Sequence, residues 1–228
     1  SGGIHIHEPG LREAVERGQA DYTPCAMSEV GSLFRNGPLP LDVALIQVSP
    51  PDAAGWCSLG LSVDIVKSAV ESAGVVIAQI NPKMPRTGGD SLISVRKITG
   101  YTEHYAELPE MARAVCDERH ERIGHYAAQI IEDGSTIQCG LGNSPEAVVR
   151  ALRKHRHLGI HSGMFHDALM DLVRCGAVDH SCKTYQPGKI IASHVLGSRG
   201  LYEFVDGNDE VALHPSEWVN DPCRIARN

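Results

Sequence analysis

The sequence predicts an α/β fold with mostly parallel sheets, arranged as two successive units. Three features support this prediction: short apolar runs rich in β-branched residues, helical patterns between those runs, and a charged connector near the middle of the chain. A strand covered on both faces reads as a nearly continuous apolar run, which is typical of parallel sheets. Alternation of such strands with helices indicates right-handed strand–helix–strand units.

Five apolar runs are the expected strands. They are DVALIQVS (42–49), GVVIAQIN (74–81), STIQCGLG (135–142), HLGIHSG (157–163) and KIIASHVLG (189–197). All are far shorter than the stretch of about 20 apolar residues that a membrane-spanning helix needs. The runs therefore predict buried strands, and no membrane partner is expected.

Helical patterns occupy the intervals between the expected strands. They cover residues 11–19, 63–74, 144–156 and 166–178. Ser144 is the predicted N-cap of the third pattern, with Pro145 at the first helical position. The fourth pattern stops at Gly176, a residue type that often follows the end of a helix.

The segment AELPEMARAVCDERH (106–120) is the best candidate for a boundary between two domains. It is charged, it begins with the turn-prone ELPE, and it separates two runs of strands and helices. We therefore expect one α/β domain over residues 1–108, a connector over 109–117, and a second α/β domain over 118–228.

The charge and cysteine content exclude several classes of function. The formal net charge is -7 and no stretch is rich in Lys and Arg, which argues against a nucleic-acid partner. The seven cysteines are odd in number and form no C-x-x-C pair, as expected of a protein from a reducing cytoplasm. The first residues show no basic region followed by an apolar run, so no signal peptide is expected. Together these features predict a cytoplasmic location.

The first candidate site is the glycine turn Gly140-Leu141-Gly142-Asn143, where an expected strand ends and a helix begins. Glycines let backbone N–H groups approach a ligand closely, and a helix N-terminus adds partial positive charge. This arrangement suits a carboxylate, a phosphate or a developing oxyanion. The third glycine of a dinucleotide-binding fingerprint is absent, and a tight turn without a ligand is the alternative interpretation.

The second candidate site is the segment LGIHSGMFHDAL, in which another strand end is followed by a helix. Ligand sites of open α/β sheets gather at the carboxyl ends of strands, and here that edge presents His161, Gly163, His166 and Asp167. A capping or surface role is the alternative for His166. The histidine spacings match no standard zinc pattern, so no metal site is predicted.

The third candidate is the loop NPKMPRTGGDS (81–91), which follows a buried strand and is rich in proline and glycine. Such a composition favours a rigid, ordered loop. Met84, Pro85 and Arg86 are candidate substrate contacts, because a guanidinium group can bind a carboxylate or a phosphate. A structural turn is the alternative.

Several long motifs occur in the same order as in a known family. They are SPPDAAGWCSLGLSVD, NPKMPRTGGD, CGLGNSPEAV and LGIHSGMFHDAL. By these motifs the chain resembles the acetyl-CoA hydrolase/transferase family of coenzyme A transferases, which includes 4-hydroxybutyrate CoA-transferases. The resemblance implies two similar α/β domains with the active site at their interface.

Members of that family are roughly twice as long, so the resemblance implies a chain that is incomplete at both ends. The chain would hold the back of the first domain and the front of the second, without the glycine-rich coenzyme A loop. A homo-oligomer or a complementary chain is therefore expected. The resemblance also implies an acyl-CoA thioester and a small carboxylate as substrates, with no permanently bound cofactor.

Family members use a glutamate that attacks the acyl-CoA thioester and then carries coenzyme A as a glutamyl thioester. The resemblance places Gly163 at the glutamate position, His166 where serine is usual, and Ala168 where glycine is usual. Gly88 stands at a position that is often histidine. A glycine has no group that can form the covalent intermediate, so the standard transfer cannot proceed through residue 163.

Three hypotheses follow from these departures. The first is altered acyl-CoA chemistry, namely hydrolysis, decarboxylation or hydration/dehydration, with His161 or His166 as base, Asp167 as its orienting partner and Gly140–Asn143 as the oxyanion cradle. The second is conventional CoA transfer with a carboxylate supplied elsewhere. The third is an inactive subunit that binds coenzyme A or serves as a scaffold.

Overall fold

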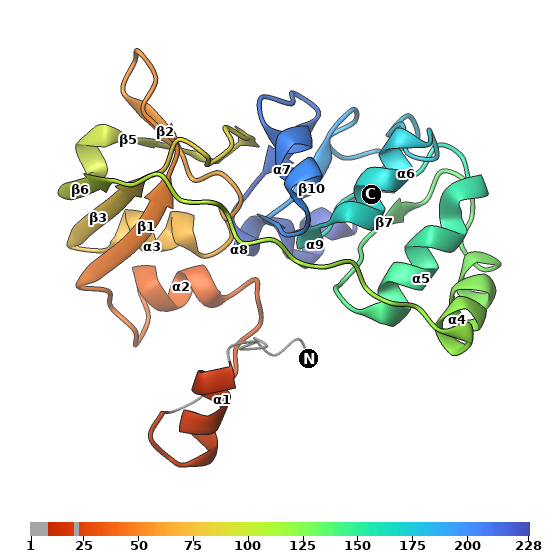
Figure 1. Cartoon of the computed structure of the whole chain (residues 1–228), viewed down its shortest axis with the longest axis horizontal. Helices are drawn as coiled ribbons and strands as arrows, with labels where there is room; N and C mark the ends of the chain where they lie inside the picture. Colours follow the sequence, from red (N-terminus) through yellow and green to blue (C-terminus); the bar gives the residue numbers. More distant parts are fainter. Residues whose placement is uncertain (1–8, 21–22) are drawn as a thin grey trace.

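The computed structural model describes residues 9–20 and 23–228. Figure 1 shows a twisted sheet at one end of the molecule, a group of helices at the other, and the last part of the chain between them. A segment without regular structure, residues 104–117, runs along the molecule from the sheet to the helices. It includes the predicted connector.

The described residues form helices and strands that are interspersed along the chain. The helices are α1 (Pro9–Glu16), α2 (Val30–Arg35), α3 (Val66–Ser72), α4 (Glu118–Ala128), α5 (Asn143–Ala151), α6 (Asp167–Arg174), α7 (Arg199–Val205), α8 (Ser216–Val219) and α9 (Pro222–Ile225), with single turns of 3-10 helix at η1 (Val95–Lys97) and η2 (Leu152–Lys154). The strands are β1 (Val43–Val48), β2 (Trp56–Ser58), β3 (Val75–Ile80), β4 (Gly88–Gly89), β5 (Leu92–Ser94), β6 (Gly100–Glu103), β7 (Thr136–Ile137), β8 (Gly159–Ile160), β9 (Met164–Phe165), β10 (Ile190–Ala192), β11 (His194–Val195) and β12 (Val211–Leu213).

The first sheet has the order β1-β3-β6 and is parallel throughout. Its first two strands are the apolar runs predicted at 42–49 and 74–81, and α3 is the crossover between them. Buried side chains such as Val48 and Ala78 face the core, while Leu45 on the opposite face is exposed. The parallel pairing and the crossover helix confirm the predicted α/β class for this part of the chain.

A second three-stranded sheet joins the first and second parts of the chain. Its order is β10-β12-β4, so Gly88 and Gly89 pair in parallel with Ala212 and Leu213. A Cβ atom on Gly88 would lie 2.7 Å from the carbonyl oxygen of Val211, which is closer than a side chain can approach. The two glycines therefore let β4 lie against β12.

The remaining strands are shorter than the apolar runs predicted. Pairing of β7 with β8 ends at Ile137 and Ile160. The next amide of β7 that could face β8 is that of Cys139, and it donates to Oγ of Ser162 at 3.1 Å instead of to a strand carbonyl. The run 189–197 is divided into β10 and β11 at Ser193, whose amide and hydroxyl both donate to the carbonyl of Gly163.

The start of α5 also differs from the prediction. The helix begins at Asn143 with Gly142 as its N-cap, and no side chain caps it, so Ser144 is inside the helix. Gly142 occupies this position because its φ of 123° suits glycine and its carbonyl accepts the amide of Glu146. At α6 the helix begins at Asp167 after His166, and Gly176 follows its end, as predicted.

One apolar core connects both parts of the chain. It includes Val48 and Val63 from the first part and Phe165, Leu169 and Leu213 from the second. The division into residues 1–108 and 118–228 stays a prediction, and the segments on its two sides share this core and the β10-β12-β4 sheet. Within residues 9–20 and 23–228, no helix has the length and apolar character that a membrane crossing requires.

Candidate active site

A large cavity, with a volume of about 970 Å³, lies where several strand ends meet. Its walls come from the turn after β7, from β9 and β11, and from the segments before α3 and after α8. The lining residues are Met27, Asp64, Met111, Gln138, Cys139, Gly140, Leu141, Gly142, Gly163, Met164, Ser193, His194, Leu196 and Asn220. The structure thus brings the glycine turn and Gly163 to one site, although they are separate motifs in the sequence.

Gly163 is held firmly on the wall of this cavity. Its carbonyl oxygen accepts the amides of Ser193 and His194 at 3.3 and 3.2 Å, and Oγ of Ser193 at 2.7 Å. Its backbone is outside the left-handed region, and an added Cβ would meet only Oδ1 of Asn220, at 3.6 Å. The fold therefore has room for a side chain at position 163.

The glycine turn presents its backbone to the same cavity. Gly140, Leu141 and Gly142 line it, and Gly142 has a φ of 123° and a ψ of 173°. That conformation is essentially restricted to glycine, and it directs the chain from β7 into the N-terminus of α5. The positive end of α5 and the nearby N–H groups suit the partial negative charge of a thioester oxygen.

A smaller cavity of about 220 Å³ adjoins the large one and shares Met111, Leu141 and Gly142 with it. Asn143, His166 and Asp167, three of the predicted site residues, line this smaller cavity rather than the large one.

His166 is almost fully buried, and its Nε2 has no hydrogen-bond partner among the described residues. Its Nδ1 lies 3.8 Å from Oε2 of Glu146, which is too long for a hydrogen bond. Burial lowers the pKa of His166 and raises the pKa of Glu146. Both shifts favour the uncharged forms of the pair.

Asp167 has a different role from the one predicted for it. Its two carboxylate oxygens accept the amide of Ser198 at 2.8 Å and the hydroxyl of Ser198 at 2.5 Å. Arg113 lies 3.6 Å away. Ser198 is the N-cap of α7, so Asp167 anchors the start of that helix and makes no hydrogen bond to His166.

His161 lies outside the cavity lining and is buried beside Tyr185 and Trp218. Its Nε2 is 2.8 Å from the carbonyl of Val219, so Nε2 carries the proton, and its Nδ1 accepts from Nδ2 of Asn228 at 3.0 Å. Burial lowers the pKa of His161. Both ring nitrogens are therefore occupied, which favours a structural role over the predicted catalytic one.

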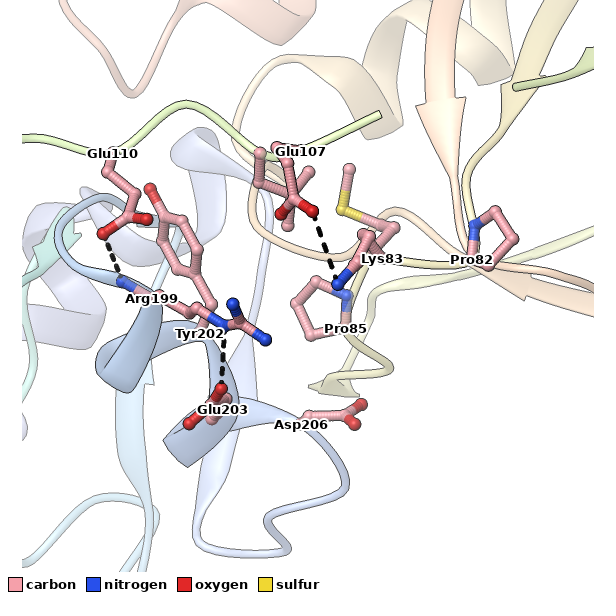
Figure 2. Close-up of a pocket in the computed structure, with 11 residues that line it drawn as sticks. Pro82, Lys83, Pro85, Glu107, Glu110, Arg199, Tyr202, Glu203 and Asp206 are labelled. Carbon is pink, nitrogen blue, oxygen red and sulfur yellow. Dashed lines mark hydrogen bonds and ion pairs between the residues drawn. The ribbon is translucent and has the colours of Figure 1, made fainter. Parts of the chain in front are cut away.

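Met84 and Pro85 line a third cavity, of about 150 Å³. Figure 2 shows this cavity, which shares no lining residue with the one at Gly163. Arg86 is already paired, because its guanidinium contacts Oδ2 of Asp52 at 2.5 Å and the carbonyl of Trp56 at 3.0 Å. The loop that was predicted to face the substrate thus does not reach the Gly163 cavity, and its arginine is not free to bind an anion.

The charged groups around this third cavity are also paired. Figure 2 shows Lys83 beside Glu107 at 3.5 Å and Arg199 beside Glu203 at 3.0 Å. The amide of Arg199 donates to Glu110 at 2.9 Å. These pairs connect the proline-rich loop, the segment after β6 and α7, which indicates a structural junction.

Among the residues of the large cavity that were not predicted, Asp64 and His194 form a titratable pair. Nδ1 of His194 lies 3.3 Å from Oδ2 of Asp64. Burial acts to raise the pKa of Asp64, but His194 and the amides of Ile65 and Val66 outweigh burial and lower it. Asp64 belongs to the quoted motif SLGLSVD, and His194 is hidden in an apolar run, so only the fold brings them together.

No group of three or more His, Cys, Asp or Glu side chains in the described ranges is placed to hold a metal ion.

Solved structures define the class of fold. The chain superposes on 4-hydroxybutyrate CoA-transferase from Porphyromonas gingivalis with a TM-score of 0.87 and 39% identity, covering 97% of this chain and 57% of that one. It superposes on RipA from Yersinia pestis with a TM-score of 0.88 and 29% identity, covering 96% and 51% of the two chains. The fold is that of the CoA-transferases.

Sequence comparisons identify the family. Residues 4–118 match the acetyl-CoA hydrolase/transferase N-terminal domain. The chain is 46% identical over 217 residues to 4-hydroxybutyrate coenzyme A transferase of Clostridium kluyveri, covering 95% of this chain and 51% of that protein. It is 40% identical to succinyl-CoA:acetate/propanoyl-CoA:succinate CoA transferase of Fasciola hepatica, covering 95% and 46%. The chain belongs to the acetyl-CoA hydrolase/transferase family, as its motifs predicted, and spans about half the length of these relatives.

Proposed function

We propose that this protein acts on acyl-CoA thioesters in the 970 Å³ cavity without forming a glutamyl thioester, and that hydrolysis is the reaction the geometry favours. The observation that carries the proposal is Gly163, which stands on the cavity wall at the position that the family resemblance assigns to the glutamate nucleophile. Among the cavity-lining residues that the structure describes, Asp64 is the only carboxylate, and it lies on a different segment.

Hydrolysis needs a bound water, a base and donors for the oxyanion, but no covalent nucleophile. The absent side chain at Gly163 leaves space next to the wall where a water molecule fits. The N–H groups of the Gly140–Asn143 turn and the N-terminus of α5 are the proposed donors to the thioester oxygen. Decarboxylation and hydration/dehydration also need a base and oxyanion donors, but they act on other acyl-CoA substrates.

Binding of the coenzyme A moiety is expected to need residues outside this chain. We propose that further polypeptide, a second copy or a complementary chain supplies them. No permanently bound cofactor is required by the reaction, and a small carboxylate acceptor is needed only if CoA is transferred instead of released to water. A cytoplasmic location is proposed with this function, since coenzyme A thioesters are the substrates.

A disarmed transferase is the second candidate, and one specific observation favours it. An added Cβ at Gly163 meets nothing closer than 3.6 Å, so the pocket still accepts the side chain that the family mechanism needs. Such a subunit would bind coenzyme A without turnover, or would depend on a carboxylate from another chain.

The test compares the natural polypeptide that carries this sequence with its Gly163→Glu and Gly163→Gln variants. Acetyl-, butyryl-, succinyl- and 4-hydroxybutyryl-CoA are supplied with and without acetate, and thiol release and intact mass after hydroxylamine are measured. We expect thiol release by the unsubstituted protein without a covalent adduct, and slower release by both variants, because either side chain fills the space of the water. Glutamine is the matched control, with nearly the size of glutamate but no nucleophile.

Two results would contradict this proposal. If the unsubstituted protein releases no thiol while only Gly163→Glu transfers CoA and forms a hydroxylamine-sensitive adduct, the protein is a disarmed transferase. If the unsubstituted protein itself forms such an adduct, a carboxylate other than residue 163 is the nucleophile.

A further inference from the structure

The large cavity that Gly163 lines also contains a histidine–carboxylate pair, His194 and Asp64. His194 follows Ser193 at the start of β11, and its amide donates to the carbonyl of Gly163 at 3.2 Å. In the parallel pairing of β11 with β9, His194 is opposite Met164, the residue after Gly163, and both line the cavity. His194 and Gly163 are thus joined through the backbone, and both line the same cavity.

Asp64 is placed to hold that imidazole in one orientation. Its Oδ1 accepts the amides of Ile65 and Val66 at the start of α3, while its Oδ2 lies 3.3 Å from Nδ1 of His194. The two oxygens therefore have separate partners. The contact is not aligned as a full hydrogen bond, since Nδ1 has no hydrogen-bond partner among the described residues. Pairs of this kind are often loosely aligned before substrate binds.

The rest of the environment leaves His194 free to react. Its side chain is 28% exposed, and Nε2 makes no hydrogen bond within the described residues and is not among the buried unpaired atoms. Cys139 is the other thiol or imidazole on this wall, and burial raises its pKa to about 12, so it stays protonated. The charged group that faces His194 is Asp64.

We propose that His194 is the general base of this cavity and that Asp64 is its positioning residue. This inference rests on the proposed acyl-CoA hydrolysis and replaces the base assignments made from sequence. Nε2 of His194 takes a proton from a water molecule, whose oxygen attacks the thioester carbonyl carbon. The carbon–sulfur bond then breaks, and the imidazolium returns the proton to the departing thiolate. The products are a free carboxylic acid, which ionises, and the coenzyme A thiol.

The test uses the natural polypeptide that carries this sequence, with His194→Gln and Asp64→Asn as the variants. Asparagine at 64 keeps an oxygen for the two amides of α3, so it separates the electrostatic role from helix capping. His125→Gln is the control for histidine, because His125 is exposed on α4, where its ring contacts Gln129 and the neighbouring Tyr126. Asp179→Asn is the control for aspartate, since Asp179 also lies beside a histidine and accepts a backbone amide.

We expect His194→Gln to lower kcat for acyl-CoA hydrolysis by about 100-fold or more with a smaller change in KM. Asp64→Asn should lower kcat by about 10-fold and move the ascending limb of the pH–rate profile to lower pH, because loss of the negative charge disfavours the imidazolium. A purely structural role of Asp64 would change thermal stability without moving that limb. Both controls should stay within about twofold of the unsubstituted protein.

Each other outcome overturns the inference in a recognisable way. If the unsubstituted protein hydrolyses acyl-CoA and His194→Gln does so equally well, the base is another group and the proposed function stands. If the unsubstituted protein hydrolyses none of the thioesters, the proposed function fails and the assignment of His194 fails with it. If His194→Gln does not fold, the pH–rate profile of the unsubstituted protein tests the inference instead. A profile without an ascending limb between about pH 5 and 8 excludes a histidine base.

Discussion

A matched pair of glycine substitutions tests the backbone geometry of the turn that we propose as the oxyanion cradle. Gly142 has a φ of 123° and a ψ of 173°, a region that L-residues almost never occupy, whereas Gly140 has no positive φ. An added Cβ at Gly142 meets nothing closer than Cδ of Pro145 at 3.8 Å, and at Gly140 it meets nothing within 4 Å. The two sites therefore differ in backbone strain and not in space.

The strain at Gly142 sets the expected size of the effect. Holding alanine in such a region costs about 1–3 kcal/mol, so Gly142→Ala should lower the free energy of unfolding by that amount. For a chain of this length the midpoint of thermal unfolding should fall by about 2–4 °C per kcal/mol. Gly140→Ala should change stability by less than about 1 kcal/mol, with either sign.

Thermal and urea unfolding of the two variants, followed by circular dichroism, measure this difference. Equal destabilisation by both substitutions would refute the reasoning, because it would locate the cost in packing against the cavity wall. A neutral Gly142→Ala would mean that the turn relaxes to another conformation. Thiol release from acyl-CoA would then show whether the relaxed turn still binds the thioester oxygen.

Three further predictions concern Asp167, Arg86 and two buried histidines. Asp167→Ala should lower the free energy of unfolding by about 2–3 kcal/mol in urea titrations, because the amide and hydroxyl of Ser198 lose a charged, buried acceptor. An unchanged midpoint of urea unfolding would contradict the anchoring role. Arg86→Gln should leave the KM for acyl-CoA within about twofold, since Arg86 lies away from the Gly163 cavity, and loss of its half-exposed ion pair with Asp52 should lower the free energy of unfolding by about 0.5–1 kcal/mol. A large rise in KM would place Arg86 in the substrate site. Burial lowers the pKa of His180 and of His214 to about 4. Between about pH 6.5 and pH 4 the unfolded chain therefore binds more protons than the folded chain. The free energy of unfolding should decrease as the pH is lowered through this window, by up to about 3 kcal/mol per histidine. His180→Asn should flatten the fall in pH-dependent urea unfolding, and an equally steep fall in the variant would exclude His180 as a cause.

The sequence was most informative where one continuous apolar run decides the local structure. The runs at 42–49 and 74–81 are apolar along their length, and they form neighbouring parallel strands with a crossover helix between them. The short strands were harder to predict. Gly88 and Gly89 have no strand propensity, and they form β4 only because β12 approaches from more than a hundred residues away.

The candidate site was predictable as a set of strand ends but not as a set of contacts. Gly163 and the turn at Gly140–Gly142 each follow a strand, and the fold brings them to one cavity. Which polar groups are already occupied depends on distant segments. His161 is bound by Val219 and Asn228, and Arg86 by Asp52, and none of these pairs leaves a signal in local sequence spacing.

His194 shows the opposite case, in which a reactive group was hidden. Its neighbours Ile190, Ile191 and Val195 are fully buried, so the whole run reads as the interior of a strand. The division of that run at Ser193 turns the next side chain toward the cavity and toward Asp64. A break of this kind arises from a tertiary hydrogen bond to Gly163 and cannot be read from propensities.

The pairing of β4 with β12 has a consequence for synthesis of the chain on the ribosome. Residues 88–89 emerge about 120 residues before their partners at 212–213, which at about 5–20 residues per second is a delay of several seconds or more. During that time the amides and carbonyls of β4 are unpaired, and core residues such as Val63 lack their later neighbours. The nascent first part can therefore bind chaperones or misassociate until the last strand arrives, and ribosomal pauses before residue 213 would prolong the exposure.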